Sequence, residues 1–349
     1  MTIKSGNIDP VKLTDFTTRS LIKVGIPEED ARITAKILVA TDLRGIDSHG
    51  VPHLANFYIK FVQDGRVNPK PNTKIFSNAP ATAVMDGDRG LGFVVGYRAM
   101  HEAIRRAKEV GAGFVSVRNS SHFGAGGNYA MMALEHDMIG ISMTEGGKGM
   151  VAPGTVGRNT GINVISIAIP AGEEAPFVLD MATTVVANGK VEITMREGKM
   201  MPEGWAIGPD GKSITDPKKY YEQGGALLPL GGAPQTGGFK GFGLAITADI
   251  LCRVLSAAAA TDQMAGEHFF GALRIDGFQP AVEFKKRMDE LVRAHRALPK
   301  APGVERLYTP GEIEQEIEKR RKSEGIPLHP SVVASLKQLA QELSIEYNL

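Results

Sequence analysis

The densest group of residues that could do chemistry lies within ten positions near the N-terminus. Arg44, Asp47, Ser48, His49 and His53 occur there together. Histidine titrates near neutral pH without perturbation, so His49 is a candidate general acid or base. Ser48 could orient the His49 ring, and Arg44 could hold a substrate carboxylate through two hydrogen bonds. The cluster therefore indicates proton transfer beside a bound acid.

Two other interpretations of this cluster stay open. Asp47, His49 and His53 have the chemistry of metal ligands, but two imidazoles four residues apart converge only on a continuous helix. Gly50 and Pro52 lie between the histidines and disfavour such a helix, so we expect no metal ion. The cluster could also be a helix end whose polar groups are satisfied by capping.

A second candidate segment, 118–127, contains His122 and is rich in glycine. It follows an expected strand and precedes an expected helix, where backbone N–H groups can bind anionic groups. His122 could instead be a core histidine. The glycines do not form the G-x-G-x-x-G pattern of a Rossmann fold. The nearest match, at Gly90, Gly92 and Gly96, has its last spacing one residue too long.

Two further segments carry a single ionisable side chain each. Asp180 ends an apolar run, where it is either a cap for the next helix or a buried partner for a histidine, and periodicity favours the cap. Lys240 opens an expected helix between glycines, which resembles an anion cradle without the spacing of a P-loop.

The elements that must position these residues change in kind along the chain. Apolar spacing and turn signals predict helices at both ends and an alternation of strands and helices in the middle, from about residue 81. This alternation indicates an α/β layer, with the two helical ends packed as one lobe. Residues 188–225 are polar and rich in glycine, with a tight turn at 209–211. Helices are expected at 13–24, 28–43, 51–62, 93–110, 128–135, 237–255, 310–322 and 330–345, and strands at 83–86, 113–117, 138–143, 165–170 and 176–179.

Composition limits the class of protein. A length of 349 residues suggests about two domains. Forty basic against 39 acidic side chains leave a net charge of +1, which argues against a nucleic-acid partner. The single Cys252 excludes an intramolecular disulfide and favours a reducing compartment. Without a signal pattern or an apolar stretch of about 18 residues, we expect a cytoplasmic protein that does not enter a membrane.

Six motifs occur in one order over essentially the whole chain. They are 42–50 (DLRGIDSHG), 119–124 (NSSHFG), 177–183 (FVLDMAT), 240–244 (KGFGL), 310–312 (PGE) and 325–330 (GIPLHP). Together they make the chain resemble the type 2 malate/L-lactate dehydrogenase family. That family includes ureidoglycolate and sulfolactate dehydrogenases, 2,3-diketogulonate reductase and cyclic imine reductases.

The resemblance implies an NAD(P)-dependent oxidoreductase that transfers hydride between the nicotinamide and a 2-oxo or 2-hydroxy acid. It also implies a non-Rossmann α/β fold and a homodimer. We expect a helical N-terminal part at 1–75, a central α/β cofactor-binding domain at 76–275, and a C-terminal part at 276–349 that returns to the first lobe. A cyclic imino-acid reductase and a cofactor-binding protein that has lost catalysis are the alternatives. The choice between NAD and NADP cannot be made from these motifs.

Roles for individual residues also follow from the resemblance. His49 matches the catalytic proton donor, with Ser48 and Asp180 as its charge-relay partners, and we expect Asp180 to raise the pKa of the imidazole. Arg44, His53, His122 and Lys148 are the candidates for binding the substrate. Cofactor contacts are expected at His122, Phe123, Gly124, Ala125, Gly126, Asp180, Met181, Ala182, Thr183, Thr184, Val185, Val186, Phe239, Lys240, Gly311, Glu312 and Ile313.

Three departures from the family pattern concern the substrate side of the site. His53 stands where many members have an arginine that holds the substrate carboxylate. Ile162, Asn163 and Val164 replace a common Thr-Asn-Pro, and 145–149 (EGGKG) replaces a common Asn-Ser pair followed by proline. The resemblance therefore predicts the redox chemistry without defining the acid.

Overall fold

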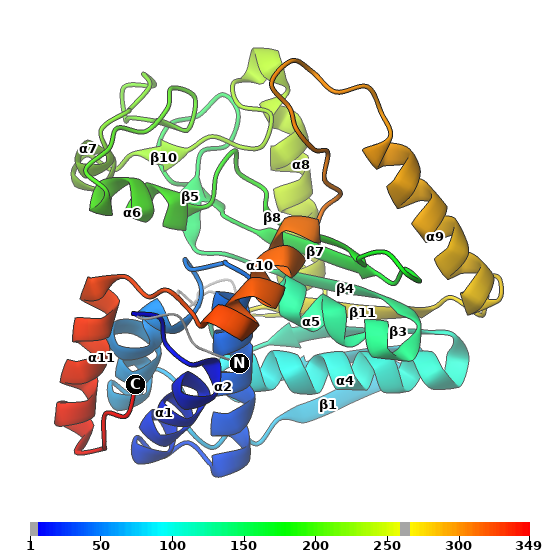
Figure 1. Cartoon of the computed structure of the whole chain (residues 1–349), viewed down its shortest axis with the longest axis horizontal. Helices are drawn as coiled ribbons and strands as arrows, with labels where there is room; N and C mark the ends of the chain where they lie inside the picture. The colour runs from blue at the N-terminus through cyan, green and yellow to red at the C-terminus, as the bar shows by residue number, and fades with distance from the viewer. Residues whose placement is uncertain (1–5, 259–265) are drawn as a thin grey trace.

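The computed structural model describes residues 6–258 and 266–349, and a seven-stranded sheet forms its centre (Figure 1). Strands β2 (Thr82–Asp86) and β3 (Ala112–Arg118) run parallel, and every other neighbouring pair of this sheet is antiparallel. The mixed α/β class that we predicted is therefore confirmed. A Rossmann sheet is mostly parallel, so this mostly antiparallel sheet is consistent with the non-Rossmann fold that the resemblance implies. The strand order is β1 (Lys74–Ala79), β2 (Thr82–Asp86), β3 (Ala112–Arg118), β11 (His268–Arg274), β4 (Met138–Thr144), β7 (Val164–Ile169) and β8 (Phe177–Ala182).

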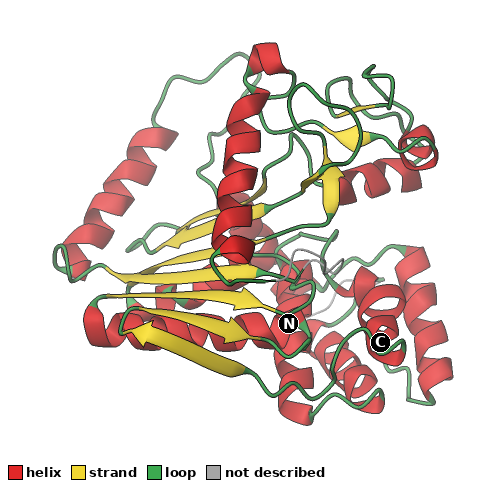
Figure 2. Ribbon diagram, turned by 180° about the vertical axis from the view of Figure 1, so that it is seen from behind, coloured by secondary structure: helices red, strands yellow, loops and turns green. Residues whose placement is uncertain are grey.

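Helices cover the sheet where their apolar faces can be buried. The long helix α4 (Gly92–Val110) packs on β3 and β11, and it ends at Gly111, whose φ of 92° suits glycine. The short helix α5 (Gly127–Met132) packs on β4 and β7. Helix α8 (Gly238–Asp249) contacts β4 and β7, and in the view from behind (Figure 2) it stands upright over the upper strands of the sheet.

The two ends of the chain lie side by side, as expected from their helical patterns. Helix α1 (Pro10–Lys23) packs on α2 (Glu28–Leu43) and on α11 (Pro330–Leu343), and α10 (Glu312–Glu324) packs on α2 (Figure 1). An isolated antiparallel bridge joins Ile8 to Ile326. One continuous apolar core runs from these helices to the sheet. The proposed division into three parts stays a prediction.

Residues 188–225 form more structure than their polar composition indicated. They contribute α6 (Asn188–Arg196), β9 (Ala206–Ile207) and α7 (Pro217–Glu222) to a small unit with its own core. Asp216 caps α7 by accepting hydrogen bonds from the backbone N–H groups of Lys218 and Lys219. The unit's sheet has the order β6 (Thr160–Gly161), β5 (Lys148–Met150), β10 (Ala226–Leu227) and β9.

Several expected elements differ in extent or continuity. The helix expected at 51–62 is broken into a 3₁₀ turn (Val51–His53), a π-helical segment η2 (Leu54–Ile59) and α3 (Lys60–Gln63). The helix expected at 237–255 continues beyond α8 as π-helical η5 (Ile250–Val254). Sequence analysis did not find β1, β11 or helix α9 (Ala281–Arg296). None of the helices within 6–258 and 266–349 is long and apolar enough to cross a membrane.

The packing of α5 on β4 gives a testable stability prediction. A Cβ added at Gly140 would lie 1.9 Å from the carbonyl oxygen of Ala130, so Gly140→Ala must displace α5 from the sheet. We expect a loss of about 1–3 kcal/mol in the free energy of unfolding, measured by urea denaturation. Gly243→Ala is the matched control, because a Cβ there meets nothing within 4 Å. Equal midpoints for the two variants would contradict the packing argument.

Candidate active site

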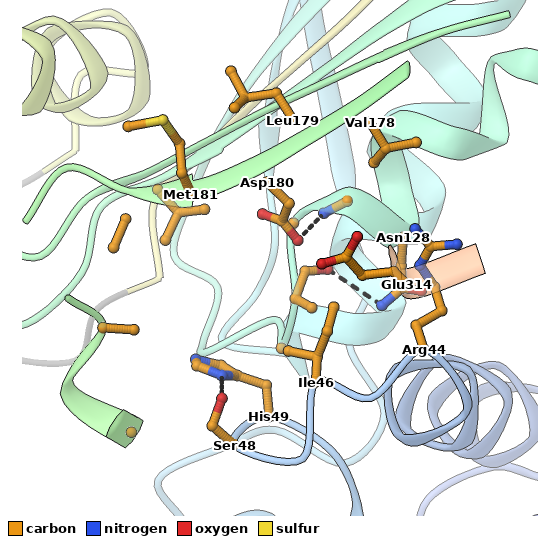
Figure 3. Close-up of a pocket in the computed structure, with 18 of the residues that line it drawn as sticks. Arg44, Ile46, Ser48, His49, Asn128, Val178, Leu179, Asp180, Met181 and Glu314 are labelled. Carbon is orange, nitrogen blue, oxygen red and sulfur yellow. Dashed lines mark hydrogen bonds between the residues drawn. The ribbon is translucent and has the colours of Figure 1, made fainter. Parts of the chain in front are cut away.

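A cavity of about 790 Å³ lies where the helical ends, the central sheet and the small unit meet. Its walls come from the turn after α2, the 122–128 segment, strand β8, the start of α6 and the segment before α10 (Figure 3). Residues 144–147, Ile162 and Val164 also line it, so the fold gathers segments that are far apart in the sequence. Of the predicted site residues, those lining the cavity are Arg44, Ser48, His49, His122, Gly124, Ala125, Gly126, Asp180, Met181, Ala182, Gly311 and Ile313.

A buried carboxyl group fixes the turn that carries His49 by a hydrogen bond to its backbone. Asp42, fully buried at the end of α2, accepts a hydrogen bond from the backbone N–H of Val51 at 2.8 Å. A Cβ at Gly50 would lie 2.0 Å from the Asp42 carboxyl, so only glycine fits there. Burial raises the pKa of Asp42 to about 8. The turn then presents Ser48, whose Oγ lies 2.9 Å from Nδ1 of His49 (Figure 3).

The other two candidate metal ligands of this turn, His53 and Asp47, each have a partner within the fold. His53 places Nε2 2.7 Å from the carbonyl oxygen of Ser48 and so donates a hydrogen bond to it. His53 does not line the cavity. Asp47 pairs with Arg321 of α10. Asp47 and His53 thus have other partners, and no group of three or more His, Cys, Asp and Glu side chains in the described ranges could hold a metal ion.

The electrostatic environment of His49 differs from our expectation. Burial, and to a smaller extent the charge of the nearby His53, lowers the pKa of His49 to about 4. Asp180 does not bond to this ring. Its carboxylate accepts hydrogen bonds from Ser166 Oγ at 2.6 Å and from the backbone N–H of Gly127 at 2.8 Å. The expectation that Asp180 raises the pKa of His49 is therefore wrong for this structure, because the carboxylate is used elsewhere.

Asp180 instead holds the first turn of α5. The hydrogen bond from Gly127 places the carboxylate at the helix N-terminus, and Figure 3 shows the side chain on the cavity wall. Cβ atoms at Gly126 and Gly127 would collide with Ser166 and Asp180, which explains the glycines of this segment. Burial raises the pKa of Asp180. Sequence analysis favoured a cap, and Asp180 acts as one for α5 and not for the helix that follows it in sequence.

Two histidine rings lie together at the cavity. The rings of His49 and His122 are stacked, with centroids 5.7 Å apart and planes 18° apart. Burial, followed by the charges of His49 and His53, lowers the pKa of His122 well below its usual value. The core interpretation of His122 is thus only partly right, since the half-buried ring also lines the cavity.

Several predicted site residues lie outside the cavity wall. Lys148 is exposed on β5, so Arg44 is the better placed of the two candidates for the substrate carboxylate. Phe123 is buried and stacked on His268 with centroids 4.6 Å apart. At the start of α8, Phe239 and Lys240 are exposed beside one another.

The remaining residues that we predicted to contact the cofactor make hydrogen bonds or packing contacts within the protein. Thr183 and Thr184 are buried and donate to backbone carbonyl groups. The backbone N–H of Val185 bonds to Leu228, and Val186 packs on the core of the small unit. Glu312 is buried.

The Glu312 carboxylate belongs to an ion-pair network before α10. It accepts from Arg296 and Arg306 and from the backbone N–H of Thr309. Arg296 also pairs with Glu174, and Arg306 with Glu316. The network supports the segment that brings Gly311 and Ile313 to the cavity. Glu312 therefore stabilises the cavity wall without lining the cavity itself.

The small unit contributes site residues that sequence analysis missed. Lys190 of α6 lines the cavity, and Gly189 lies so close to the catalytic turn that a Cβ would stand 2.6 Å from Cβ of Ser48. Glu314 at the start of α10 also lines it. Two of the three departures from the family pattern, at 145–147 and Ile162, do reach the cavity. No local motif marks Lys190 or Glu314, because only the tertiary fold brings them here.

Residues 8–337 match the family model of malate/L-lactate dehydrogenases, and the chain belongs to that family. It is 42% identical over 345 residues to a malate dehydrogenase of Pyrococcus horikoshii, covering 96% of this chain and 95% of the relative. An L-sulfolactate dehydrogenase of Methanocaldococcus jannaschii is 40% identical, covering 93% and 94%. The crystal structure of a malate dehydrogenase from Entamoeba histolytica has a TM-score of 0.95 at 34% identity, covering 98% and 99%. These full-length similarities make the chain a 2-hydroxyacid dehydrogenase.

The environment of His49 predicts an unusual titration in the free protein. We expect NMR to give a pKa of about 4 for His49, since burial favours the neutral ring. This value is lower than that of histidine in the unfolded chain. The contribution of His49 to the free energy of unfolding should therefore be complete above pH 6.5 and should decrease as the pH falls toward 4. The His49→Gln spectrum assigns the resonance. A pKa at or above 6.5 would refute this account of the site.

Proposed function

We propose that this enzyme uses NAD or NADP to interconvert a small 2-oxo acid and its 2-hydroxy acid, with His49 exchanging the proton on oxygen. The observation that carries the proposal is the Ser48–His49 pair on a cavity that Arg44 also lines. An imidazole for proton transfer and a guanidinium for a carboxylate are the groups that this chemistry needs.

The cavity wall is compatible with a nicotinamide cofactor. Its volume of about 790 Å³ lies within the usual range for cofactor pockets. Gly124, Gly126, Asp180, Gly311 and Ile313 all line this cavity. We infer that these residues hold the cofactor. When bound, the nicotinamide supplies or accepts the hydride.

In the free protein the low pKa keeps the His49 ring neutral at pH 7. This is the protonation state from which the ring can accept the proton of a substrate hydroxyl group. For reduction of a 2-oxo acid the ring must gain a proton, and the negative charge of the bound acid favours that change. Ser48 keeps the ring in place through Nδ1.

Arg44 is the residue that we propose for the substrate carboxylate. It is 7% exposed, and Nη1 lies 3.1 Å from Glu318 Oε2, which restricts its position. Within the described part of the chain, the arginine and lysine side chains that line the cavity are those of Arg44 and Lys190. Arginine binds a carboxylate in two-pronged geometry, so the acid is expected at Arg44.

We further propose a cytoplasmic homodimer. The resemblance to the family suggests the dimer, and α8 with η5 carries exposed apolar side chains that would suit a contact between copies, including Phe239, Ile250 and Val254. The buried free thiol of Cys252 fits a reducing compartment.

Replacing His49 tests the proton-transfer role directly. We expect His49→Ala to lower kcat by about 10²–10⁴-fold while the affinity for the dinucleotide is retained, because a positioned acid or base contributes this much. Steady-state rates and fluorescence titration with NADH and NADPH measure the two quantities. His295→Ala, on the exposed face of α9, is the control and should behave as wild type. Unchanged kcat in His49→Ala would refute the role.

A substrate screen separates the proposal from its alternatives. We expect oxidation of NADH or NADPH with at least one of oxaloacetate, pyruvate and sulfopyruvate, since Arg44 suits an acid. Higher kcat/KM with a cyclic imino acid would instead identify an imine reductase. Tight dinucleotide binding without turnover across the panel would identify a protein that has lost catalysis. Comparing the two dinucleotides at equal concentration decides the cofactor preference.

A further inference from the structure

The two stacked histidine rings of the cavity have different hydrogen-bond partners. Nδ1 of His49 faces a single hydroxyl group, that of Ser48. Nδ1 of His122 faces two donors, the backbone N–H of Gly124 at 3.3 Å and the hydroxyl group of Tyr58 at 2.9 Å. Two neighbouring imidazoles with different partners are suited to two different tasks.

The partners of His122 define its tautomer. A backbone N–H can only donate, so Nδ1 must carry a lone pair and the Tyr58 hydroxyl group donates to it as well. The proton of the neutral ring is then on Nε2. In the residues that the structure describes, Nε2 has no hydrogen-bond partner, and the side chain lines the cavity. His122 therefore has one N–H group left for a ligand.

The fold keeps both donors in place. Gly124 has a φ of 78°, and a Cβ there would lie 2.7 Å from the ring of Phe93, so the turn that aims its N–H at His122 requires glycine. Tyr58 is 1% exposed and packs edge-on against Phe93, with centroids 4.8 Å apart. It belongs to the π-helical segment η2, and such segments are frequent at functional sites.

Burial of the pair supports the same assignment. It raises the pKa of Tyr58, which keeps the hydroxyl proton available for donation. Burial also lowers the pKa of His122, which keeps the ring neutral. A neutral imidazole can donate a hydrogen bond to a substrate oxygen without giving up its proton.

We propose that Tyr58 and Gly124 hold His122 as a neutral Nε2–H donor that binds an oxygen atom of the 2-oxo acid, while His49 transfers the proton. Tyr58 is then a positioning residue that acts through His122. The assignment to a 2-oxo acid rests on the proposed function, whereas the tautomer rests on the hydrogen bonds alone.

NMR of the free protein tests the tautomer without any substrate. Long-range ¹H–¹⁵N spectra distinguish Nε2–H, Nδ1–H and charged histidine, and His122→Gln assigns the signal. We expect Nε2–H in wild type at neutral pH. Tyr58→Phe should add a detectable share of another form, and Tyr97→Phe should not. A charged ring or an Nδ1–H ring in wild type would overturn the proposal.

Kinetics test the task of the Nε2–H group. Glutamine offers a neutral N–H and cannot titrate, so His122→Gln should keep kcat/KM for the acid within about 10-fold of wild type with an unchanged pH profile. His122→Ala should lose about 10–100-fold, mostly as a raised KM for the acid, with KM for the dinucleotide unchanged. Loss of the pH dependence in His122→Gln would show that His122 transfers the proton and would overturn the proposal, as would a raised KM for the dinucleotide alone.

The two proposals fail in different ways. Wild-type protein that turns over no 2-oxo acid refutes the proposed function, and the NMR spectrum then still decides the tautomer. Active wild-type enzyme with the wrong tautomer refutes the role of Tyr58 and leaves the dehydrogenase proposal in place.

Discussion

The hydrogen bond between the buried Asp42 carboxyl group and the backbone of Val51 is the constraint on which the site depends. It closes the turn between α2 and the broken helix that follows, and that turn aligns Ser48 with His49. The carbonyl group of Asp42 also accepts from Arg321, which belongs to α10 near the other end of the chain. The turn is therefore tied to both ends of the chain, and the helical lobe is part of the candidate active site.

Asp180 shows how one carboxylate can organise a site without touching the reacting group. By accepting from Ser166 and Gly127 it joins β7, β8 and the start of α5, so the 122–127 segment keeps a fixed position relative to the sheet. His122 is the ionisable side chain of that segment at the cavity. The two rings stack on one another, but their hydrogen-bond partners differ: Ser48 for His49, and Tyr58 with Gly124 for His122. This difference in partners favours a division of tasks between them.

Sequence analysis identified what depends on local spacing and missed what depends on strand register. The 44–49 cluster and the glycine-rich 122–127 segment were found because neighbouring residues carry their signals. The partner of Asp180 was not, because Ser166 meets it only through the pairing of β7 with β8. Strand β11 was missed since a central strand buried on both faces lacks alternation, and its His268 is buried among aromatic rings. Tyr58 was missed because it lies in an apolar stretch whose spacing indicates only a helix.

The ion pairs behind the segment that leads into α10 have a consequence for heat resistance. Glu312 is shared by Arg296 and Arg306, and these arginines reach Glu174 and Glu316 in turn. The cost of removing water from charged groups falls as temperature rises, so a linked set of this kind contributes more in hot solution than in cold. The ion pairs beside Gly311 should therefore stabilise this part of the cavity wall more as the temperature rises. The stabilisation from apolar contacts levels off over the same range.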